Sequence, residues 1–367
     1  MMNLFTLPNR TASPSVPLTH IRVSVAHLTG PGKLGASNGS LIFETAGSKQ
    51  VRLDTDGLSD ILAYGEVTLT CGAMKIIDQN KIALTWLSTN GCDVHGRFTH
   101  EHSDRCLTRL LQFQSWEDKR WQLMTAQHIV SSKVESIHSA MRHYQRQGRT
   151  IEKGLLDKIS ASVLRCGEAE SVDQLRGIEG YASALWFGCY STLFRGNWKF
   201  TTRNRRPPKD PVNSLLSLFY MQILHRVVAR IESKGYEVGL GALHEFRPGR
   251  ASMACDIIEP LRVPVVDRWV LAICHQGIVK PSDFETQESG AVFLAKTSIG
   301  KVLGRFEEHW HQGNFESIME QQIKDWIVMM RENVSLTTSR AATYLKTRLV
   351  RESTNQGAGR TELDAMQ

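Results

Sequence analysis

One helix-forming stretch constrains the fold more than any other part of the chain. Asp210 is a good N-cap, and Pro211 can occupy the first helical position, where its missing N–H costs nothing. The run that follows, VNSLLSLFYMQILHRVVARI, is apolar on nearly every side, and Lys234-Gly235 is a typical helix end. A helix that is apolar all round must be covered by other elements. The sequence therefore predicts a domain with this helix at its centre.

A second stretch places acids in an apolar segment. Asp256 and Glu259 are three residues apart, so on a helix their carboxylates share a face, and most of their neighbours are apolar. Buried acids must be paired, protonated or bound to a metal. If His244 folds back towards them, the three side chains form a metal site of nitrogen and oxygen ligands. The alternative is a buried ion-pair network in which His244 and Arg250 or Arg262 neutralise the acids.

A third acid lies on the apolar stripe of another predicted helix. The segment from Ser171 to Phe194 has helical periodicity, and Glu179 falls on the stripe, four residues after Leu175. A carboxylate on a buried face again needs a partner. A core ion pair with Arg176 is one interpretation, although Arg176 is only three residues away and could equally reach solvent.

Composition narrows the class of protein. The chain has 367 residues, 41% of them hydrophobic and 22% charged, which is enough for two soluble domains. A net charge of +7 favours polyanionic partners. No apolar run approaches the length of a membrane span, and the N-terminus lacks a signal-peptide core. Seven scattered cysteines without a CxxC pair point to a reducing cytoplasm.

The predicted fold class is α+β, with a small N-terminal β-sandwich-like domain followed by a larger all-α catalytic domain. Residues 1–18 are expected to form a flexible tail, and 19–98 a mostly antiparallel β domain of short strands with one short helix, Leu58 to Tyr64. A linker is expected at 99–106. Helical periodicity then runs over 107–350, including a last helix from Thr337 to Val350, before a disordered tail at 351–367.

The region around the linker is rich in potential zinc ligands. Their spacing fits no structural zinc pattern, so solvated linker residues are the preferred interpretation. The residues concerned are Cys92, His95, His100, His102 and Cys106.

A basic loop joins the helix that carries Glu179 to the central helix. Its cations alternate with Trp198 and Phe200, a mixture that suits DNA with single-stranded ends, because cations meet phosphates and aromatic rings stack on unpaired bases. A solvated loop is the alternative. The cations that we expect to contact DNA, including two from the segment after His244, are Arg203, Arg205, Arg206, Lys209, Arg247 and Arg250.

Three motifs in order resemble those of one family, the CRISPR-associated integrase that serves as catalytic subunit of the spacer-acquisition complex. They are LRGIEGYASALWF (Leu175 to Phe187), PPKDPVNSLLSLFYMQIL (Pro207 to Leu224) and LHEFRPGRASMACDIIEPLR (Leu243 to Arg262). The resemblance covers about Thr19 to Val350. One departure is that Met253-Ala254-Cys255 replaces a run that contains leucine in the family.

The resemblance implies a catalytic set of Glu179, His244 and Glu259, with Asp256 as a nearby acid. Glu179, His244 and Glu259 would hold Mg²⁺ or Mn²⁺, and which of Asp256 and Glu259 is the main acidic ligand stays open. The implied reaction is transesterification, in which the 3′-hydroxyl of a short DNA fragment attacks a phosphodiester at a repeat end. No nucleotide cofactor is needed, and the chain contains no P-loop motif.

The resemblance also implies partners. These are double-stranded DNA with single-stranded 3′ ends, CRISPR repeat DNA, a second copy of the chain paired through residues 19–98, and a small ferredoxin-fold CRISPR adaptation protein. Two functions of other classes are the alternatives. One is a metal-dependent nuclease acting on branched DNA in repair, and the other is a non-catalytic DNA-binding scaffold.

Overall fold

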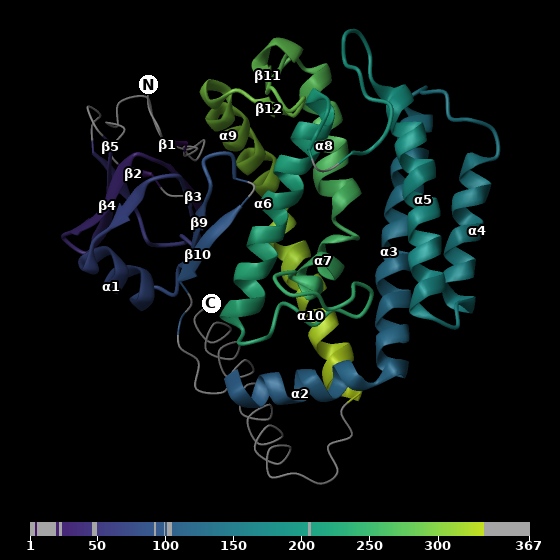
Figure 1. Ribbon diagram of the computed structural model, residues 1–367, viewed down its shortest axis with the longest axis horizontal. Helices are drawn as coiled ribbons and strands as arrows, with labels where there is room; N and C mark the ends of the chain where they lie inside the picture. The colour runs from purple at the N-terminus through teal and green to yellow at the C-terminus, as the bar shows by residue number, and fades with distance from the viewer. Residues whose placement is uncertain are drawn as a thin grey trace, which may run out of the picture.

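The computed structural model describes residues 4–5, 20–21, 24–45, 50–91, 93–98, 100, 105–204 and 207–333. A β domain and a larger helical domain lie side by side, with the central helix α6 at their boundary (Figure 1). The fold class is therefore α+β, as the sequence predicts. None of the described helices has the length and apolar character needed to cross a bilayer.

The β domain contains two five-stranded sheets. The first has the strand order β1-β3-β7-β9-β10, and the second has the order β2-β6-β5-β4-β8. The strands are β1 (Leu4–Phe5), β2 (His20–Ile21), β3 (Val25–Thr29), β4 (Gly32–Ser37), β5 (Ser40–Thr45), β6 (Val51–Leu53), β7 (Asp60–Tyr64), β8 (Val67–Leu69), β9 (Ala83–Leu87) and β10 (Val94–Phe98).

The first sheet is buried on both faces. Ile61 and Ala63 of β7 join the core between the two sheets, whereas Leu62 and Tyr64 join the core of the helical domain. Every residue of β7 is consequently buried. A strand covered on both sides shows no alternation of polar and apolar residues, so its hydrophobic pattern cannot distinguish it from a buried helix. The predicted helix from Leu58 to Tyr64 is for this reason wrong: most of it is strand β7.

The predicted antiparallel arrangement also needs correction, because each sheet mixes the two directions. Strand β7 pairs in parallel with both β3 and β9, and β4 pairs in parallel with β8. Neighbouring parallel strands require a crossover connection. Part of the crossover between β7 and β9 is helix α1 (Cys71–Gln79), which the sequence analysis misses and which Thr70 caps through its side chain.

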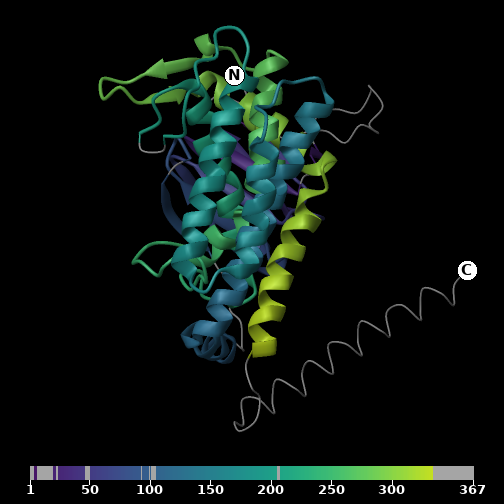
Figure 2. The ribbon, with the colours of Figure 1, turned by 90° about the vertical axis from the view of Figure 1, so that its right-hand side faces the viewer.

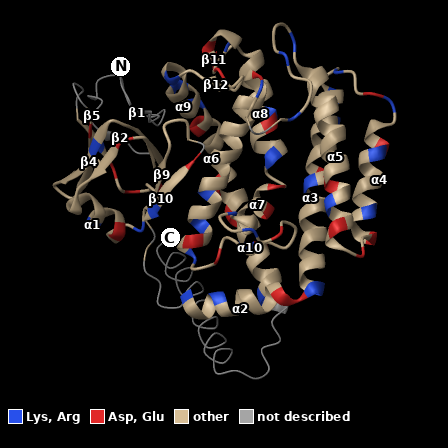
Figure 3. Ribbon diagram, viewed as in Figure 1, with Lys and Arg blue, Asp and Glu red and all other residues tan. Residues whose placement is uncertain are grey.

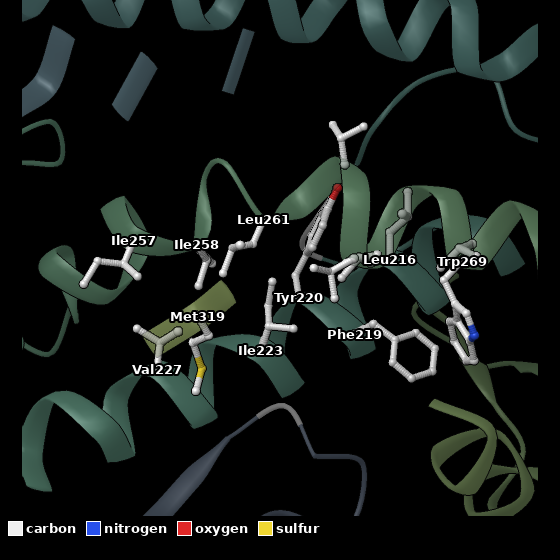
Figure 4. Packing of buried hydrophobic residues seen from close by; sticks show 14 of the residues in the cluster. Leu216, Phe219, Tyr220, Ile223, Val227, Ile257, Ile258, Leu261, Trp269 and Met319 are labelled. Atoms are coloured by element: carbon white, nitrogen blue, oxygen red, sulfur yellow. The ribbon is translucent and has the colours of Figure 1, made fainter. Parts of the chain in front are cut away.

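The helical domain is built around α6 (Pro211–Ser233), as predicted. Asp210 caps the first turn by accepting from the Asn213 N–H, and Gly235 takes a positive φ of 82° beyond the last turn. Tight packing surrounds the helix (Figure 4). The labelled side chains at this contact are Leu216, Phe219, Tyr220, Ile223 and Val227 from α6, with Ile257, Ile258, Leu261, Trp269 and Met319 around them.

The remaining helices flank α6. They are α2 (Arg105–Glu117), α3 (Lys119–Arg146), α4 (Leu155–Glu168), α5 (Val172–Leu193), α7 (Ser252–Ile258), α8 (Arg268–His275), α9 (Lys296–Gln312) and α10 (Phe315–Asn333), with a π-helical turn at Arg262–Asp267 and a 3₁₀ turn at Pro281–Asp283. A hairpin of β11 (Phe284–Thr286) and β12 (Val292–Leu294) projects from the helical domain (Figure 2). The predicted helix from Thr337 to Val350 lies outside the described residues.

Candidate active site

A buried lysine ammonium lies between two of the three predicted acids. Lys133, on α3, donates to Glu179 Oε1 and, at 2.5 Å, to Glu259 Oε2. Lys133 and Glu259 are buried, whereas 26% of the Glu179 side chain is exposed. Three elements far apart in sequence therefore meet at one charge cluster: α3, α5 and the end of α7.

Glu179 does not pair with the arginine that the sequence alternative assigns to it. Arg176 instead contacts Asp173 and Glu245, and its Nε donates to the Leu243 carbonyl at 2.9 Å. The same oxygen of Glu179 that receives Lys133 also accepts the Ser183 hydroxyl at 2.9 Å. Glu179 thus points towards α7, and Arg176 fixes the loop that carries His244.

Asp256 lies behind His244 and is fully buried. Its Oδ2 accepts from the backbone N–H groups of Ala242 and Leu243, at 2.6 and 3.0 Å. Its Oδ1 accepts from the His244 N–H at 3.0 Å and contacts His244 Nδ1 at 2.7 Å. Because a carboxylate only accepts, Nδ1 carries a proton, and in the neutral imidazole Nε2 is then the nitrogen with the free lone pair. Nε2 faces Glu259, 3.8 Å from Oε1.

The turn before His244 can approach Asp256 this closely because residue 241 is glycine. A Cβ at Gly241 would lie 2.9 Å from Asp256 Oδ2 and 2.9 Å from the His244 carbonyl oxygen. Contacts that short with a backbone atom force the chain apart. Trp116 holds the same turn from outside, since its indole N–H donates to the Gly241 carbonyl at 3.1 Å. The loop is therefore fitted to the carboxylate that orients the histidine.

Glu259 follows the last residue of α7 and is kept ionised by its neighbours. Arg262 Nη2 lies 3.0 Å from Glu259 Oε1, on the oxygen that Lys133 does not contact. Burial by itself would raise the pKa of Glu259, but the charges of Arg262 and Lys133 outweigh it and lower that pKa to about 2. The alternative of a buried ion-pair network is thus partly confirmed, because Arg262 pairs with Glu259. Arg250, the other arginine considered, is not the partner of Asp256 or Glu259.

The side chains present fit a divalent cation in type, but a lysine fills the space. Within the described ranges, no three His, Cys, Asp or Glu side chains are placed so that they could hold a metal as they stand. The Lys133 ammonium occupies the position between the carboxylates. Two carboxylates and one imidazole Nε2 are a donor set that suits Mg²⁺ or Mn²⁺. The ligand types therefore suit a divalent ion, but binding of the ion between the carboxylates requires Lys133 to move.

A cavity of about 740 Å³ lies next to this cluster and shares Arg262 with it. Arg262 and Arg203 both line the cavity, and their guanidinium groups lie 4.7 and 5.4 Å from the ring centre of Tyr220. The Tyr220 hydroxyl donates to Asp267, whose pKa burial raises to about 6. None of Glu179, His244 and Glu259 lines the cavity, so it adjoins the acidic site and is not the same space.

The predicted DNA-binding cations lie in two separate loops. Arg203 is half-buried and bonds to Asn213 and Ser217 of α6, whereas Lys209 is exposed. Arg247 is exposed beside Glu245, and Arg250 is half-buried. Arg205 and Arg206 lie outside the described residues. Basic and acidic residues both occur on α3, α4 and α5 (Figure 3), and basic residues outnumber acidic ones on α3.

His100, one of the residues considered for zinc, is already saturated and is not solvated. Its Nδ1 contacts Asp78 Oδ1 at 2.9 Å, and its Nε2 bonds to the Ile82 carbonyl at 2.9 Å. The side chain is buried. Cys92 and His102 lie outside the described residues. His100 thus ties the end of the β domain to helix α1.

Lys133 is the site residue that the sequence analysis misses. It lies on the buried stripe of α3, three residues after Val130 and four before Ile137. That is the same signal that identifies Glu179 as unusual on α5. A lysine on one apolar stripe and a glutamate on another are natural partners, since neither charge can be buried alone.

Comparisons with known proteins identify relatives of this chain. Residues 26–308 match the family described as CRISPR associated protein Cas1. The chain is 31% identical to the CRISPR-associated endonuclease Cas1 1 of Thermodesulfovibrio yellowstonii over 282 residues, which cover 74% of this chain and 86% of that protein.

Two solved structures share the fold. A CAS1 protein from Thermotoga maritima has a TM-score of 0.71 at 19% identity, covering 88% of this chain and 100% of the other. A casposase bound to integration product has a TM-score of 0.70 at 17% identity, covering 86% and 92%. The family match spans most of the chain, and it includes every residue of the acidic cluster. The protein therefore belongs to the Cas1 family of CRISPR-associated proteins, whose curated relatives are endonucleases.

Proposed function

We propose that this protein inserts short DNA fragments into a CRISPR array by metal-dependent transesterification. The 3′-hydroxyl of a fragment attacks a phosphodiester at a repeat end, so one phosphodiester bond forms as another breaks. Membership of the Cas1 family supports the endonuclease and integrase class. The observation that carries the proposal is the clustering of the three candidate ligands: Lys133 bridges the carboxylates of Glu179 and Glu259, and His244 Nε2 lies 3.8 Å from Glu259 Oε1.

In this proposal Glu179, Glu259 and His244 would hold Mg²⁺ or Mn²⁺. When bound, the ion would polarise the phosphate that is attacked and stabilise the charge of the transition state. Glu259 is the better acidic ligand of the two candidates, because among the described residues its Oε2 contacts only the flexible Lys133, whereas both oxygens of Asp256 accept from backbone N–H groups or from His244. Asp256 then acts by orienting the imidazole.

The other residues prepare the site for this reaction. Asp256 keeps the proton on His244 Nδ1, which leaves Nε2 to bind the ion or to hydrogen-bond a reacting oxygen. Arg262 holds Glu259 ionised and anchors on the face of Tyr220. Ser183 fixes one oxygen of Glu179. Each contact restricts the rotamers of a ligand before substrate arrives.

The DNA end would enter through the cavity beside Arg262. Two guanidinium groups and the ring of Tyr220 line that cavity, a combination that suits an unpaired nucleotide and its phosphate. The exposed cations Lys209 and Arg247 would contact the backbone of the flanking duplex. Arg205, Arg206 and Arg250 stay assigned to DNA by prediction alone.

We further propose that two copies pair through their β domains and bind a small ferredoxin-fold adaptation protein. Because the first sheet is covered on both faces, a partner copy would have to use the second sheet or a free edge such as β10. Two active sites are needed to join both ends of one fragment. Light scattering should give the mass of two chains at micromolar concentration, and a mass of one chain throughout would contradict pairing.

A half-site integration assay tests the proposed reaction. A labelled fragment with 3′-hydroxyl ends is mixed with a supercoiled plasmid carrying a CRISPR repeat, with and without the small adaptation partner. We expect label in the plasmid with Mg²⁺ or Mn²⁺, none in EDTA, and none from a 3′-deoxy fragment. Cleavage of branched DNA without label transfer would favour the repair nuclease. Wild-type activity of Glu179→Ala would show that the assignment is wrong.

A further inference from the structure

We infer that Lys133 is an internal cation that holds the ligand carboxylates together in the metal-free protein and gives up its place when a metal binds. The inference rests on the proposed metal-dependent function and concerns the same site. It makes Lys133 a positioning residue that sets metal affinity, and not a permanent member of the loaded site.

The first argument is one of space. The Lys133 ammonium contacts one oxygen from each of Glu179 and Glu259. A metal bound by both carboxylates needs the same position, and two cations cannot share it. Since the metal-free cluster does not hold three ligands close enough for an ion, loading requires a side chain to leave.

The second argument is charge. Lys133 and Arg262 carry two positive charges against the two negative charges of Glu179 and Glu259, and with His244 neutral the buried Asp256 adds a third negative charge. A divalent ion added beside Lys133 would turn this net charge of −1 into +1. If Lys133 leaves, the cluster with its ion is neutral. Departure of Lys133 thus offsets the charge that the ion brings into the buried site.

The third argument identifies which cation moves. Arg262 is fixed on two sides, by Glu259 and by the face of Tyr220 at 4.7 Å. Lys133 has hydrogen bonds only to the two carboxylates among its described contacts, and its four-carbon stem is flexible. The cluster also opens to solvent beside it, since the side chains of Glu179 and His244 are 26% and 22% exposed.

Lys133→Met tests the inference, because methionine keeps an unbranched, flexible side chain that matches the apolar stem of lysine and removes its charge. Mn²⁺ alone is titrated by calorimetry into the full-length wild type, Lys133→Met and a matched control, Lys158→Met, which removes an exposed charge on α4. We expect Lys133→Met to bind Mn²⁺ about tenfold more tightly than wild type. The control should bind like wild type.

Thermal unfolding gives a second readout, the difference in unfolding temperature between wild type and Lys133→Met. For a merely structural lysine this difference would not depend on Mn²⁺. In EDTA, Lys133→Met should unfold at a lower temperature than wild type, because two carboxylates are left with one cation. Saturating Mn²⁺ should narrow that gap. An equal gap in both conditions, unchanged or weaker Mn²⁺ binding, or a variant that stays unfolded even in Mn²⁺ would overturn the inference.

The titration also separates this inference from the proposed function. If neither wild type nor Lys133→Met binds Mn²⁺, the metal site itself is wrong. If wild type binds Mn²⁺ and Glu179→Gln weakens that binding, while Lys133→Met leaves it unchanged, the metal site stands and only the exchange of cations is wrong.

Discussion

Two buried glutamates of this protein have nearly the same chemical surroundings. Glu259 lies against Arg262, Lys133 and His244, and Arg262 stacks on Tyr220. Glu307, on α9, lies against Arg226 and His27, and the Arg226 guanidinium lies 4.5 Å from the centre of the Trp310 ring. In both cases burial alone would raise the pKa, but the surrounding groups lower it to about 2.

The difference between the two clusters is access. The Glu307 cluster joins β3, α6 and α9, and the side chains of His27 and Arg226 are 0% and 1% exposed. It is closed and locks the β domain onto the helical domain. The Glu259 cluster opens to solvent through Glu179 and His244 and contains a flexible lysine. The same kind of ionic group is therefore structural where it is sealed and suited to chemistry where it is open.

The largest expected effect is a difference in strand-transfer activity between variants of Glu259 and variants of Glu307. Glu259→Gln should lower strand transfer by about 10⁴-fold, because it removes a charged ligand from the reacting site. Glu307→Gln should stay within a few-fold of wild type when both proteins are folded. The half-site integration assay measures both, and circular dichroism at the assay temperature checks folding. Equal losses in the two variants would contradict the distinction.

The next largest effect is a loss of protein stability when the closed Glu307 cluster is disrupted. Glu307→Ala leaves Arg226 buried without its counter-ion and His27 without a hydrogen-bond partner, so the free energy of unfolding should drop by about 3–5 kcal/mol. Urea denaturation measures the change. Glu308→Ala is the matched control, since that side chain is more exposed and pairs with Arg305 on the surface. A loss below 1 kcal/mol for Glu307→Ala would show that the cluster does not lock the domains.

Acid should weaken both clusters in the same pH window. A glutamate whose pKa falls from 4.5 in the unfolded chain to about 2 in the fold stabilises the protein above pH 4.5, and loses that contribution as the pH falls through 2. Each group can contribute roughly 3 kcal/mol. Glu307→Gln should therefore approach wild-type stability as the pH is lowered. Urea denaturation from pH 6 to pH 2 follows this, and a constant difference would rule it out.

The smallest expected effect concerns Asp256, which acts through His244. Asp256→Asn keeps the shape but places an amide N–H₂ group against N–H donors, so the imidazole loses part of its support. Strand transfer should fall by about 10–100-fold, less than for Glu259→Gln. If Asp256→Asn is as inactive as Glu259→Gln and equally folded, Asp256 is itself a ligand.

Much of this architecture can be predicted from the sequence because local signals agree with the fold. The cap at Asp210, the proline after it and the apolar run set the bounds of α6. Glu179 and Glu259 stand out because acids on apolar stripes need a partner. Strand β7 could not be predicted from such local signals, because a strand buried on both faces shows no alternation of polar and apolar residues.

The partners of the acids could not be predicted, because they depend on how distant elements pack. Arg176 is three residues from Glu179 in sequence, yet it turns to Asp173 and Glu245, while Lys133 comes from another helix. Local spacing identifies which charges need a partner. Tertiary packing decides which partner each charge receives.

Anomalous scattering from crystals grown with Mn²⁺ tests the central claim most directly. The account predicts a manganese peak bonded to an oxygen of Glu179, an oxygen of Glu259 and Nε2 of His244, with the Lys133 ammonium no longer between the carboxylates. A manganese peak elsewhere, with Lys133 still in contact with both Glu179 and Glu259, would contradict it.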